Sequence, residues 1–393
     1  MIKKRRLFLE IEPYLNSPEA IVVTGMRRTG KTTLLRHFYE RDPSANKLFL
    51  DLENPLFRKY FEEENYDRIR LSLESLGLDF SREPRIYLDE VQHMRSLPSA
   101  VKYLMDHHGV KFLLTGSAGF YLKNVFSETL AGRKYLFELF PLSFGEFLEF
   151  KDSGFRLPRE ASDLTPAVFN TVAPLYDEYL LYGGFPGVVL KSRPEEKKRA
   201  LDEIFTSFYQ QEIVGWGDFR KNETVRDLIL LLAQRTGSRL DAGRLSVELG
   251  VARATVGKYL AFLEGTYLIK SVRPFAKRRD VEIRKIPKLY FCDCGLANRL
   301  ARIDEGCLFE NSVFQALRLR GELRYYERKT GPEIDFILDG RAGFEAKLTP
   351  RETDARKLEK TARQIGLESW TLVSKRRAPE GFCGHLTYAF LLD

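Results

Sequence analysis

Residues 21–35 read Ile-Val-Val-Thr-Gly-Met-Arg-Arg-Thr-Gly-Lys-Thr-Thr-Leu-Leu, and this stretch decides the fold of the N-terminal half. Its apolar start predicts a buried strand, and the spacing of Leu34, Leu35 and Phe38 predicts a helix. The loop between them has glycines at 25 and 30 and ends in Lys-Thr, which is the pattern of a phosphate-binding loop (P-loop). A chance Gly-Lys-Thr turn is the alternative, but such a turn would need neither the strand before it nor the helix after it.

Each residue type in this loop has a physical reason. The glycines let backbone N–H groups turn inward around phosphate oxygens, and the start of the following helix adds its positive dipole end. We expect Lys31 to reach the β- and γ-phosphates, Thr32 to place its hydroxyl on Mg²⁺, and Thr33 to contact the α-phosphate. The two arginines of the loop either contact phosphate or face solvent. The predicted nucleotide-binding residues are Gly25, Arg28, Thr29, Gly30, Lys31, Thr32 and Thr33.

A second motif, Arg-Ile-Tyr-Leu-Asp-Glu at 85–90, is an apolar strand that ends in two carboxylates. An isolated Asp-Glu pair is usually an exposed strand end. After a P-loop, however, Asp89 is expected to hold the shell of Mg²⁺, and Glu90 to orient or deprotonate the attacking water. The two motifs together predict ATP and Mg²⁺ as the cofactors.

Two further residues are catalytic candidates. Residues 113–117, Leu-Leu-Thr-Gly-Ser, form a third apolar strand end, which would bring Ser117 toward the γ-phosphate. The alternative is an ordinary turn in which the hydroxyls bond the backbone. Arg133 follows Leu-Ala-Gly and is either an arginine finger, acting in the same or a neighbouring subunit, or a structural ion-pair partner.

The apolar runs of the first half alternate with helix-like stretches. The runs lie at 21–24, 48–52, 86–88, 112–115 and 135–139. This rhythm is typical of a parallel sheet with crossover helices, and it predicts an α/β fold class.

Length and charge place limits on the rest of the chain. A chain of 393 residues is expected to form two to four domains of about 100–200 residues each. The net charge is +8, and residues 226–290 carry 14 Lys and Arg against 6 Asp and Glu. This window favours a polyanionic partner such as DNA, although a solvated basic face would look the same.

The sequence predicts a cytoplasmic protein without membrane spans. No apolar run reaches the roughly 18 residues of a spanning helix, and the basic start leads into an amphipathic helix pattern. The cysteines are few and late, which favours a reducing compartment. A zinc site is an alternative to buried structural thiols, and its ligands would be Cys292, Cys294, Cys307 and His385.

Residues 226–275 predict a winged helix-turn-helix. Apolar helices at 228–233, 242–249 and 254–263, a Gly-Val turn before the last of them, and a strand from 267 fit this motif. The alternative is a lid or a protein-docking module. The predicted nucleic-acid contacts lie on the third helix and on the wing: Arg253, Thr255, Lys258, Arg273, Lys277, Arg278 and Arg279.

The C-terminal segment carries an Asp followed by Glu-x-Lys, the signature of restriction-endonuclease-like folds. In such folds two carboxylates bind Mg²⁺, and a lysine stabilises the attacking water or the charged transition state. Here they are Asp335, Glu345 and Lys347, with Glu310 as a further carboxylate. Asp335 faces Glu345 only if the hairpin loop has an odd length, for instance 339–341, or contains a bulge. The alternative is an ion-pair network without activity.

Taken together, these motifs resemble those of a large prokaryotic family of AAA-type P-loop ATPases with a C-terminal domain of unknown function. The matching strings lie at 25–33, 87–92, 114–117, 130–133, 141–147, 183–186, 310–311, 333–336 and 345–347. The resemblance implies an AAA-type P-loop core (1–165), a helical lid (166–225), a winged helix (226–288) and a restriction-endonuclease-like α/β domain (289–393). It supplies no known substrate.

Three functional hypotheses stay open from the sequence. The first is an AAA-type ATPase that hydrolyses ATP and acts on DNA through the winged helix and the nuclease-like domain. The second is an ATP-driven signalling or scaffold switch that binds a protein. The third is an ATP-regulated, Mg²⁺-dependent nuclease. A homo-oligomer is compatible with all three, since AAA-type cores often form rings.

Overall fold

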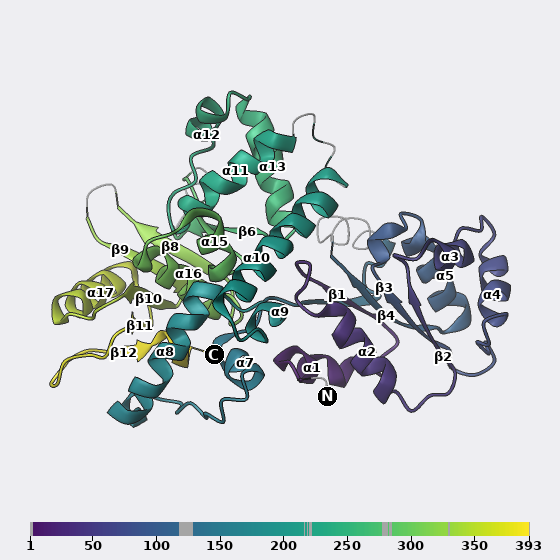
Figure 1. Ribbon diagram of the computed structural model, residues 1–393, viewed down its shortest axis with the longest axis horizontal. Helices are drawn as coiled ribbons and strands as arrows, with labels where there is room; N and C mark the ends of the chain where they lie inside the picture. Colours follow the sequence, from purple (N-terminus) through teal and green to yellow (C-terminus); the bar gives the residue numbers. More distant parts are fainter. Residues whose placement is uncertain are drawn as a thin grey trace. The chain divides into compact units, whose positions relative to one another are not determined.

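The computed structural model describes residues 3–117, 129–215, 217, 219, 222–276, 282, 285–328 and 331–392. The chain forms two compact units (Figure 1). Unit 1 comprises Met1–Phe140 with Gly265–Tyr267, and unit 2 comprises Pro141–Glu264 with Leu268–Asp393. Among the described residues, no helix combines the length and the apolar character needed to cross a membrane.

Unit 1 is built on a five-stranded sheet in the order β2-β3-β4-β1-β5. Every neighbouring pair is parallel, so the predicted parallel core is confirmed. The strands are β1 (Ala20–Thr24), β2 (Lys47–Asp51), β3 (Arg85–Asp89), β4 (Lys111–Gly116) and β5 (Lys134–Glu138). The helices are α1 (Arg6–Ile11), α2 (Lys31–Arg41), α3 (Pro55–Arg58), α4 (Tyr66–Glu74) and α5 (Leu97–His108).

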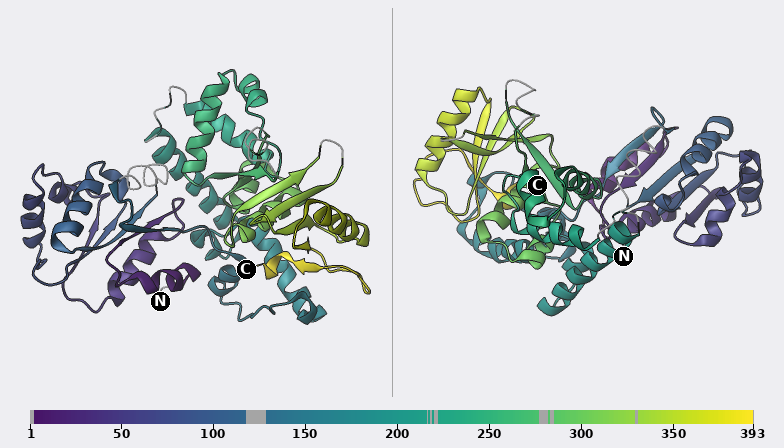
Figure 2. Two further views of the ribbon diagram at one scale, coloured as in Figure 1. Left: turned by 180° about the vertical axis from the view of Figure 1, so that it is seen from behind. Right: turned by 90° about the horizontal axis from the view of Figure 1, so that it is seen from above.

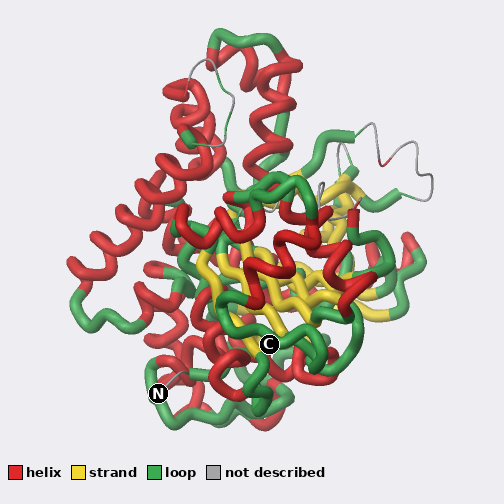
Figure 3. The backbone as a smooth tube through the Cα atoms, turned by 90° about the vertical axis from the view of Figure 1, so that its right-hand side faces the viewer, coloured by secondary structure: helices red, strands yellow, loops and turns green. Residues whose placement is uncertain are grey.

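Helices cover both faces of this sheet (Figure 2). Strand β1 alternates between the two cores: Ala20 and Val22 pack with α4 and α5, whereas Ile21 and Val23 pack with α1 and α2. Figure 3 shows strands, in yellow, behind red helices. Because all strands are parallel, the C-terminal ends of β1, β3 and β4 meet at one edge of the sheet.

Unit 2 contains a mixed seven-stranded sheet in the order β12-β11-β10-β9-β8-β6-β7. Its strands are β6 (Ile269–Pro274), β7 (Lys288–Phe291), β8 (Leu323–Glu327), β9 (Glu333–Leu338), β10 (Ala342–Lys347), β11 (Ser369–Ser374) and β12 (Leu386–Tyr388). Its helices are α7 (Phe144–Phe150), α8 (Pro166–Tyr182), α9 (Pro186–Val189), α10 (Pro194–Phe208), α11 (Asn222–Gln234), α12 (Ala242–Leu249), α13 (Arg253–Gly265), α15 (Cys294–Ala301), α16 (Glu305–Leu317) and α17 (Glu352–Ile365).

Different helices cover the two faces of this sheet. The larger core joins Phe314 of α16 and Tyr176 of α8 with Phe336 and Phe344 of the central strands. On the other face, Leu358 of α17 packs in a smaller core around Ile337 and Leu372. The two cores hold the central hairpin, β9 and β10, from both sides.

The segment expected to be a winged helix consists of α11, α12 and α13, followed by the antiparallel pair β6 and β7. Gly250, between α12 and α13, has a φ of +62°, which suits the predicted turn. Strand β6 also pairs in parallel with β8 at Arg273. A boundary at 288/289 would therefore cut one continuous sheet, because β7 begins at Lys288. The four-part division of the chain otherwise stays a prediction.

The cysteines are free thiols. Cys292 and Cys294 are buried, and Cys383 is exposed. Within the described part of the chain, the one group of His, Cys, Asp and Glu side chains spaced to hold a metal ion contains no cysteine. Cys292 and Cys294 thus fit the prediction of buried structural thiols, whereas Cys307 is half-buried.

Candidate nucleotide-binding site and candidate metal centre

The P-loop joins β1 to α2 at the edge where the parallel strands end. Gly25 has a φ of +156°, and a Cβ on it would lie 2.1 Å from the carbonyl oxygen of Leu139, so glycine is required there. Gly30 has a φ of +101°, and a Cβ on it would meet no atom within 4 Å. The loop is therefore tightly backed on the sheet side and open in front of Gly30.

Lys31 is the first residue of α2 and is only 4% exposed. Its Nζ donates hydrogen bonds to the carbonyl oxygens of Gly25, at 3.0 Å, and Met26, at 2.9 Å. The ammonium group thus lies across its own loop. Beside it, the first N–H groups of α2 carry the positive end of the helix dipole.

Other predicted residues of the loop differ in exposure. Thr29 is buried and its hydroxyl donates to the carbonyl oxygen of Met26 at 2.9 Å, so this hydroxyl supports the loop. Arg28 is exposed and has a φ of +63°. Thr33 is exposed on α2, whereas Thr32 is half-buried.

Arg5 supports the loop from outside the motif, and we did not predict this role from the sequence. It is buried, and its guanidinium donates to the carbonyl oxygens of Thr29, at 3.1 Å, and Phe140, at 2.9 Å. The contact joins residues 24 and 135 positions apart, so no local sequence signal marks it.

Asp89 ends β3 beside the P-loop and is buried. Burial raises the pKa of the Asp89 carboxyl, while hydrogen bonds with the Thr115 and Thr32 hydroxyls act in the opposite direction. Thr115, near the end of β4, donates its hydroxyl to Asp89 Oδ1. Thus Thr32 and Asp89, both predicted magnesium ligands, lie together, and Thr115 is an additional member of the site.

Glu90 and Ser117, both predicted catalytic residues, meet through Gln92. The Gln92 side-chain amide donates to the Glu90 carboxylate and, at 2.9 Å, to Ser117 Oγ. Its Oε1 accepts the backbone N–H of Ser117 at 3.2 Å. Ser117 Oγ itself lies 3.4 Å from Glu90 Oε2. Gln92 was not among the predicted site residues.

Arg133 lies at the opposite edge of the sheet. It directly precedes β5, and its carbonyl oxygen accepts the N–H of Ala20, the first residue of β1, at 2.9 Å. The P-loop follows the other end of β1, roughly 16 Å away for a five-residue strand. Arg133 Nε donates instead to Asp106 at 2.8 Å. This geometry excludes contact with a nucleotide on its own P-loop, and contact from a neighbouring copy stays a prediction.

The candidate metal centre of unit 2 depends on the register of β9 and β10. Leu338 pairs with Ala342, which leaves the three-residue loop 339–341 and satisfies the odd-length condition. Asp339, with a φ of +50°, and Gly340, with +71°, make this turn. Continuing the register puts Asp335 opposite Glu345.

The two carboxylates replace backbone hydrogen bonds where the hairpin opens. The backbone pairing of the two strands extends as far as Phe344 with Phe336. Beyond it, Asp335 Oδ2 accepts the N–H of Ala346 at 3.0 Å, and Glu345 Oε2 accepts the N–H of Asp335 at 3.3 Å. Both side chains are therefore fixed by the strands that carry them.

Glu310 lies on the other side of Asp335 and has a different role from the one expected. Lys288 Nζ lies 3.2 Å from both Glu310 Oε1 and Asp335 Oδ1, with only 9% of its side chain exposed. Tyr290 also donates its hydroxyl to Glu310, at 2.7 Å. This lysine lies where a cation shared by Glu310 and Asp335 would lie, so Glu310 is part of an internal ion pair.

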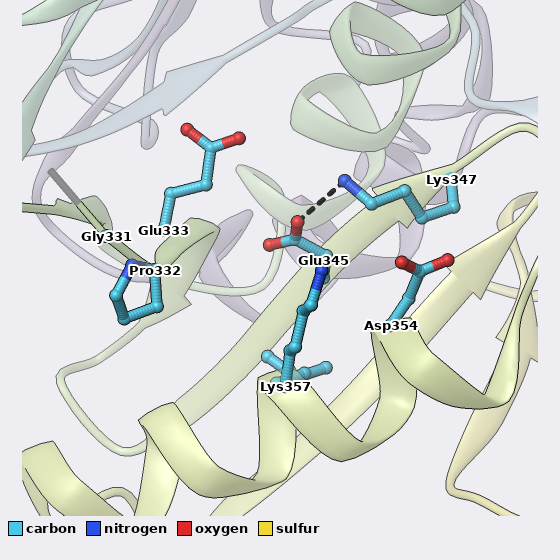
Figure 4. Close-up of a pocket in the computed structure, with 8 residues that line it drawn as sticks. Gly331, Pro332, Glu333, Glu345, Lys347, Asp354 and Lys357 are labelled. Atoms are coloured by element: carbon cyan, nitrogen blue, oxygen red, sulfur yellow. Dashed lines mark hydrogen bonds and ion pairs between the residues drawn. The ribbon is translucent and has the colours of Figure 1, made fainter.

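Glu333 takes the place predicted for Glu310. Ligand atoms of Glu333, Asp335 and Glu345 lie within 4.8 Å of one another. Glu333 and Glu345 line a cavity of about 240 Å³, with Lys347 and, from α17, Asp354 (Figure 4). Lys347 Nζ lies 2.7 Å from Glu345 Oε1.

Burial dominates the electrostatics of this cluster. It raises the pKa of Glu345 to about 8, with Asp335 adding to the rise and Lys347 opposing it. It likewise raises the pKa of Glu310 to about 7, with Asp335 adding to the rise and Lys288 opposing it. A carboxyl group whose pKa is raised by burial exchanges its proton for a divalent cation when one binds.

The predicted nucleic-acid residues that the structure describes are exposed, apart from Thr255. Arg253 and Lys258 on α13 and Arg273 on β6 are exposed, and Thr255 is half-buried. Lys277, Arg278 and Arg279 lie outside the described residues.

Two family models match this chain, one in its N-terminal part and one in its middle part. Residues 17–148 match a family described as AAA domain, and residues 173–306 match one described as a domain of unknown function (DUF8612). An uncharacterized protein of Haemophilus influenzae is 28% identical over 377 residues and covers 90% of each chain. An uncharacterized protein of Methanocaldococcus jannaschii is 25% identical over 394 residues, covering 95% of this chain and 85% of that one.

The solved structure of a Walker-type ATPase of Pyrococcus abyssi has 18% sequence identity and a TM-score of 0.47, and covers 76% of this chain and 96% of that one. The resemblance stated from the sequence is confirmed: an AAA domain is followed by a domain of unknown function, and relatives occur in bacteria and archaea.

Proposed function

We propose that this chain, whose residues 17–148 match an AAA domain, binds ATP with Mg²⁺ at its P-loop and hydrolyses the γ-phosphate. One observation carries the proposal. Lys31, Thr32 and Asp89 gather at one edge of the sheet of unit 1, with Glu90 next in sequence. An ammonium, a hydroxyl and two carboxylates next to a helix start are the donor set that a triphosphate with Mg²⁺ needs.

In the proposed reaction, the loop N–H groups and Lys31 bind the phosphate oxygens and stabilise the charge of the transition state. Thr32 and Asp89 would hold Mg²⁺, which neutralises phosphate charge when bound. Glu90 orients a water and accepts its proton as the water oxygen bonds to the γ-phosphorus. The bond to the β–γ bridging oxygen breaks, and ADP leaves with that electron pair.

ATP turnover of a Lys31→Ala variant tests the binding site. We expect phosphate release to fall by about 10²-fold or more, because the variant loses a charged donor to the phosphates. The exposed Lys59 provides a matched control, and Lys59→Ala should turn over ATP as the parent does. Equal turnover in all three proteins would contradict the proposal.

We further propose that ATP hydrolysis acts on DNA bound by unit 2. The order of α11, α12, α13 and the β6–β7 pair supports a winged helix-turn-helix, and Arg253 and Lys258 lie exposed on its third helix. Diverging side chains of Asp335, Glu345 and Lys347 would favour a scaffold switch, and these side chains contact one another instead.

The carboxylate cluster supports a second candidate function, Mg²⁺-dependent hydrolysis of a phosphodiester. Glu333, Asp335 and Glu345 would hold the ion, and Lys347 would stabilise charge on the phosphate. Mg²⁺-dependent cutting of DNA should disappear in Lys347→Ala and persist in Lys360→Ala, which removes an exposed lysine of α17. Cutting that persists in Lys347→Ala, or that needs no divalent ion, would rule this activity out at the cluster.

A further inference from the structure

Gln92 occupies an unusual position between two of the proposed catalytic residues. It is the middle residue of the short 3-10 helix Val91–His93, which begins directly after Glu90. None of its side chain is exposed. A buried side-chain amide must have its hydrogen bonds satisfied inside the protein, and this amide satisfies both its donor and its acceptor side at the end of β3 and β4. Its partners are Glu90 and Ser117.

The chemistry of these bonds fixes which way the amide points. Oε1 accepts the backbone N–H of Ser117. A backbone N–H can only donate, so the atom facing it must be the amide oxygen. Nε2 must then face the Glu90 carboxylate and Ser117 Oγ, to which it donates. A flipped amide would set its oxygen against the carboxylate, so only one orientation satisfies both partners.

Glu90 also has an uncommon backbone conformation. Its φ of +52° and ψ of +45° lie in the left-handed region, which residues other than glycine seldom adopt. That conformation turns the chain sharply at the end of β3. The turn brings residue 92 back toward the carboxylate of residue 90 and toward the end of β4.

We infer that Gln92 is the positioning residue of the ATPase site: its amide holds the Glu90 carboxylate in the orientation for accepting a proton from water and ties it to Ser117. This inference rests on the proposed ATP hydrolysis. Ser117 then acts through two contacts, its own hydroxyl at 3.4 Å from Glu90 and the shared amide of Gln92. Nucleotide binding by Lys31 and the loop does not involve this amide.

Two substitutions separate the role of the amide from its volume. Gln92→Met keeps an unbranched side chain of similar length and removes both donor and acceptor. Gln92→Glu keeps the shape and retains only an acceptor when ionised. We expect kcat for ATP hydrolysis to fall by about 10–100-fold in both, since small displacements of a catalytic group have effects of this size. The dissociation constant for a fluorescent ATP analogue should stay close to the parental value.

The pH profile gives a readout that a purely structural role would not change. In Gln92→Glu the new carboxyl adjoins Glu90, and two carboxyls in one site share a proton. Protonation restores a donor toward the neighbouring carboxylate. The turnover of Gln92→Glu relative to the parent should therefore rise as the pH is lowered from about 8 to 6, whereas the relative turnover of Gln92→Met should stay flat.

Several results would overturn the inference. Parental kcat in Gln92→Met is one, and a kcat and a nucleotide affinity that fall together in both variants are another. If Gln92→Met does not fold, the isosteric Gln92→Glu decides, and a flat relative pH profile there counts against the role. A parent without any ATP turnover would overturn the proposed function as well, whereas normal parental turnover with an active Gln92→Met overturns only the role of Gln92.

Discussion

At the residue scale, Lys288 decides which carboxylates of unit 2 remain available to a metal ion. Burial alone would lower the pKa of its ammonium group, but Asp335 and Glu310 together raise it above its ordinary value. The lysine is therefore charged and pairs with Glu310 and with Oδ1 of Asp335, so Asp335 is shared between this ion pair and the candidate metal group. The outer group, Glu333 with Glu345, lines the cavity and has its charge only partly balanced by Lys347.

Asp293 is a second buried charged residue with a structural role, and it contacts the string Gly-Gly-Phe-Pro at 183–186. It is fully buried, and it accepts the N–H of Gly184 at 2.7 Å and of Leu296 at 2.8 Å. The first bond ties it to the end of α8, and the second caps α15. The segment 183–186 thus takes part, through Asp293, in joining two helices.

A Gly183→Ala variant tests this packing. Gly183 has a φ of +75°, and a Cβ on it would lie 1.9 Å from Asp293 Oδ1. We expect the free energy of unfolding to fall by about 2–4 kcal/mol, from overpacking together with left-handed strain. Urea denaturation measures this change.

Gly187 offers a matched control in the same segment. A Cβ there would meet no atom within 4 Å, and the residue belongs to α9. Gly187→Ala should be neutral or stabilising by up to about 1 kcal/mol. Equal stability of Gly183→Ala and Gly187→Ala would contradict the described packing around Asp293.

At the element scale, α13 is the part of unit 2 that a nucleic acid would contact in a winged helix. Val256, Tyr259 and Leu263 are buried on one side of this helix, and Arg253 and Lys258 are exposed. The surrounding window at 226–290 has the surplus of basic residues that the sequence predicts for a polyanion-binding surface.

Charge reversal on α13 tests the DNA proposal. Arg253→Glu with Lys258→Glu should weaken binding of a short duplex by about tenfold or more and make the affinity less dependent on salt, because fewer counterions are released. Fluorescence anisotropy across a salt series measures both effects. Lys198→Glu with Arg199→Glu reverses two exposed charges on α10 and should change little. The same loss in both double variants would show that only net charge matters.

The elements also show what the sequence was able to predict. Strands β1, β3 and β4 with their terminal polar residues follow from local apolar runs, and so does the hairpin that pairs Leu338 with Ala342. The replacement of Glu310 by Glu333 in the candidate metal group could not be predicted from the sequence. It depends on Lys288, which lies 47 residues from Asp335 in sequence. Only the folded sheet brings them together.

Long-range contacts also escaped prediction in the sheet of unit 2 and at the candidate ATPase site of unit 1. The short parallel contact between β6 and β8 involves just Arg273 and Pro274, too little to leave a sequence pattern. Gln92 lies next to a predicted motif, but its contact with Ser117 spans 25 residues and depends on the left-handed turn at Glu90. Arg133 precedes a strand, and only the strand direction reveals which edge of the sheet it occupies.

At the scale of the whole molecule, the two units carry different chemistry. Unit 1 holds the phosphate-binding loop with Asp89 and Glu90. Unit 2 holds α13 and the carboxylates of Glu333, Asp335 and Glu345. We propose that ATP hydrolysis in the first unit drives the action of the second on nucleic acid. Everything in that proposal depends on the first unit being an ATPase.

The most direct measurement is ATP binding and hydrolysis by Glu90→Gln beside the parent and a Glu64→Gln control, which changes an exposed carboxylate of the same unit. We predict that Glu90→Gln binds ATP with Mg²⁺ as the parent does and that its kcat falls by about 10²-fold or more, because the proton acceptor is lost while the loop is intact. Glu64→Gln should match the parent in both. A Glu90→Gln protein that hydrolyses ATP at the parental rate, or a parent that binds no nucleotide, would contradict the central claim.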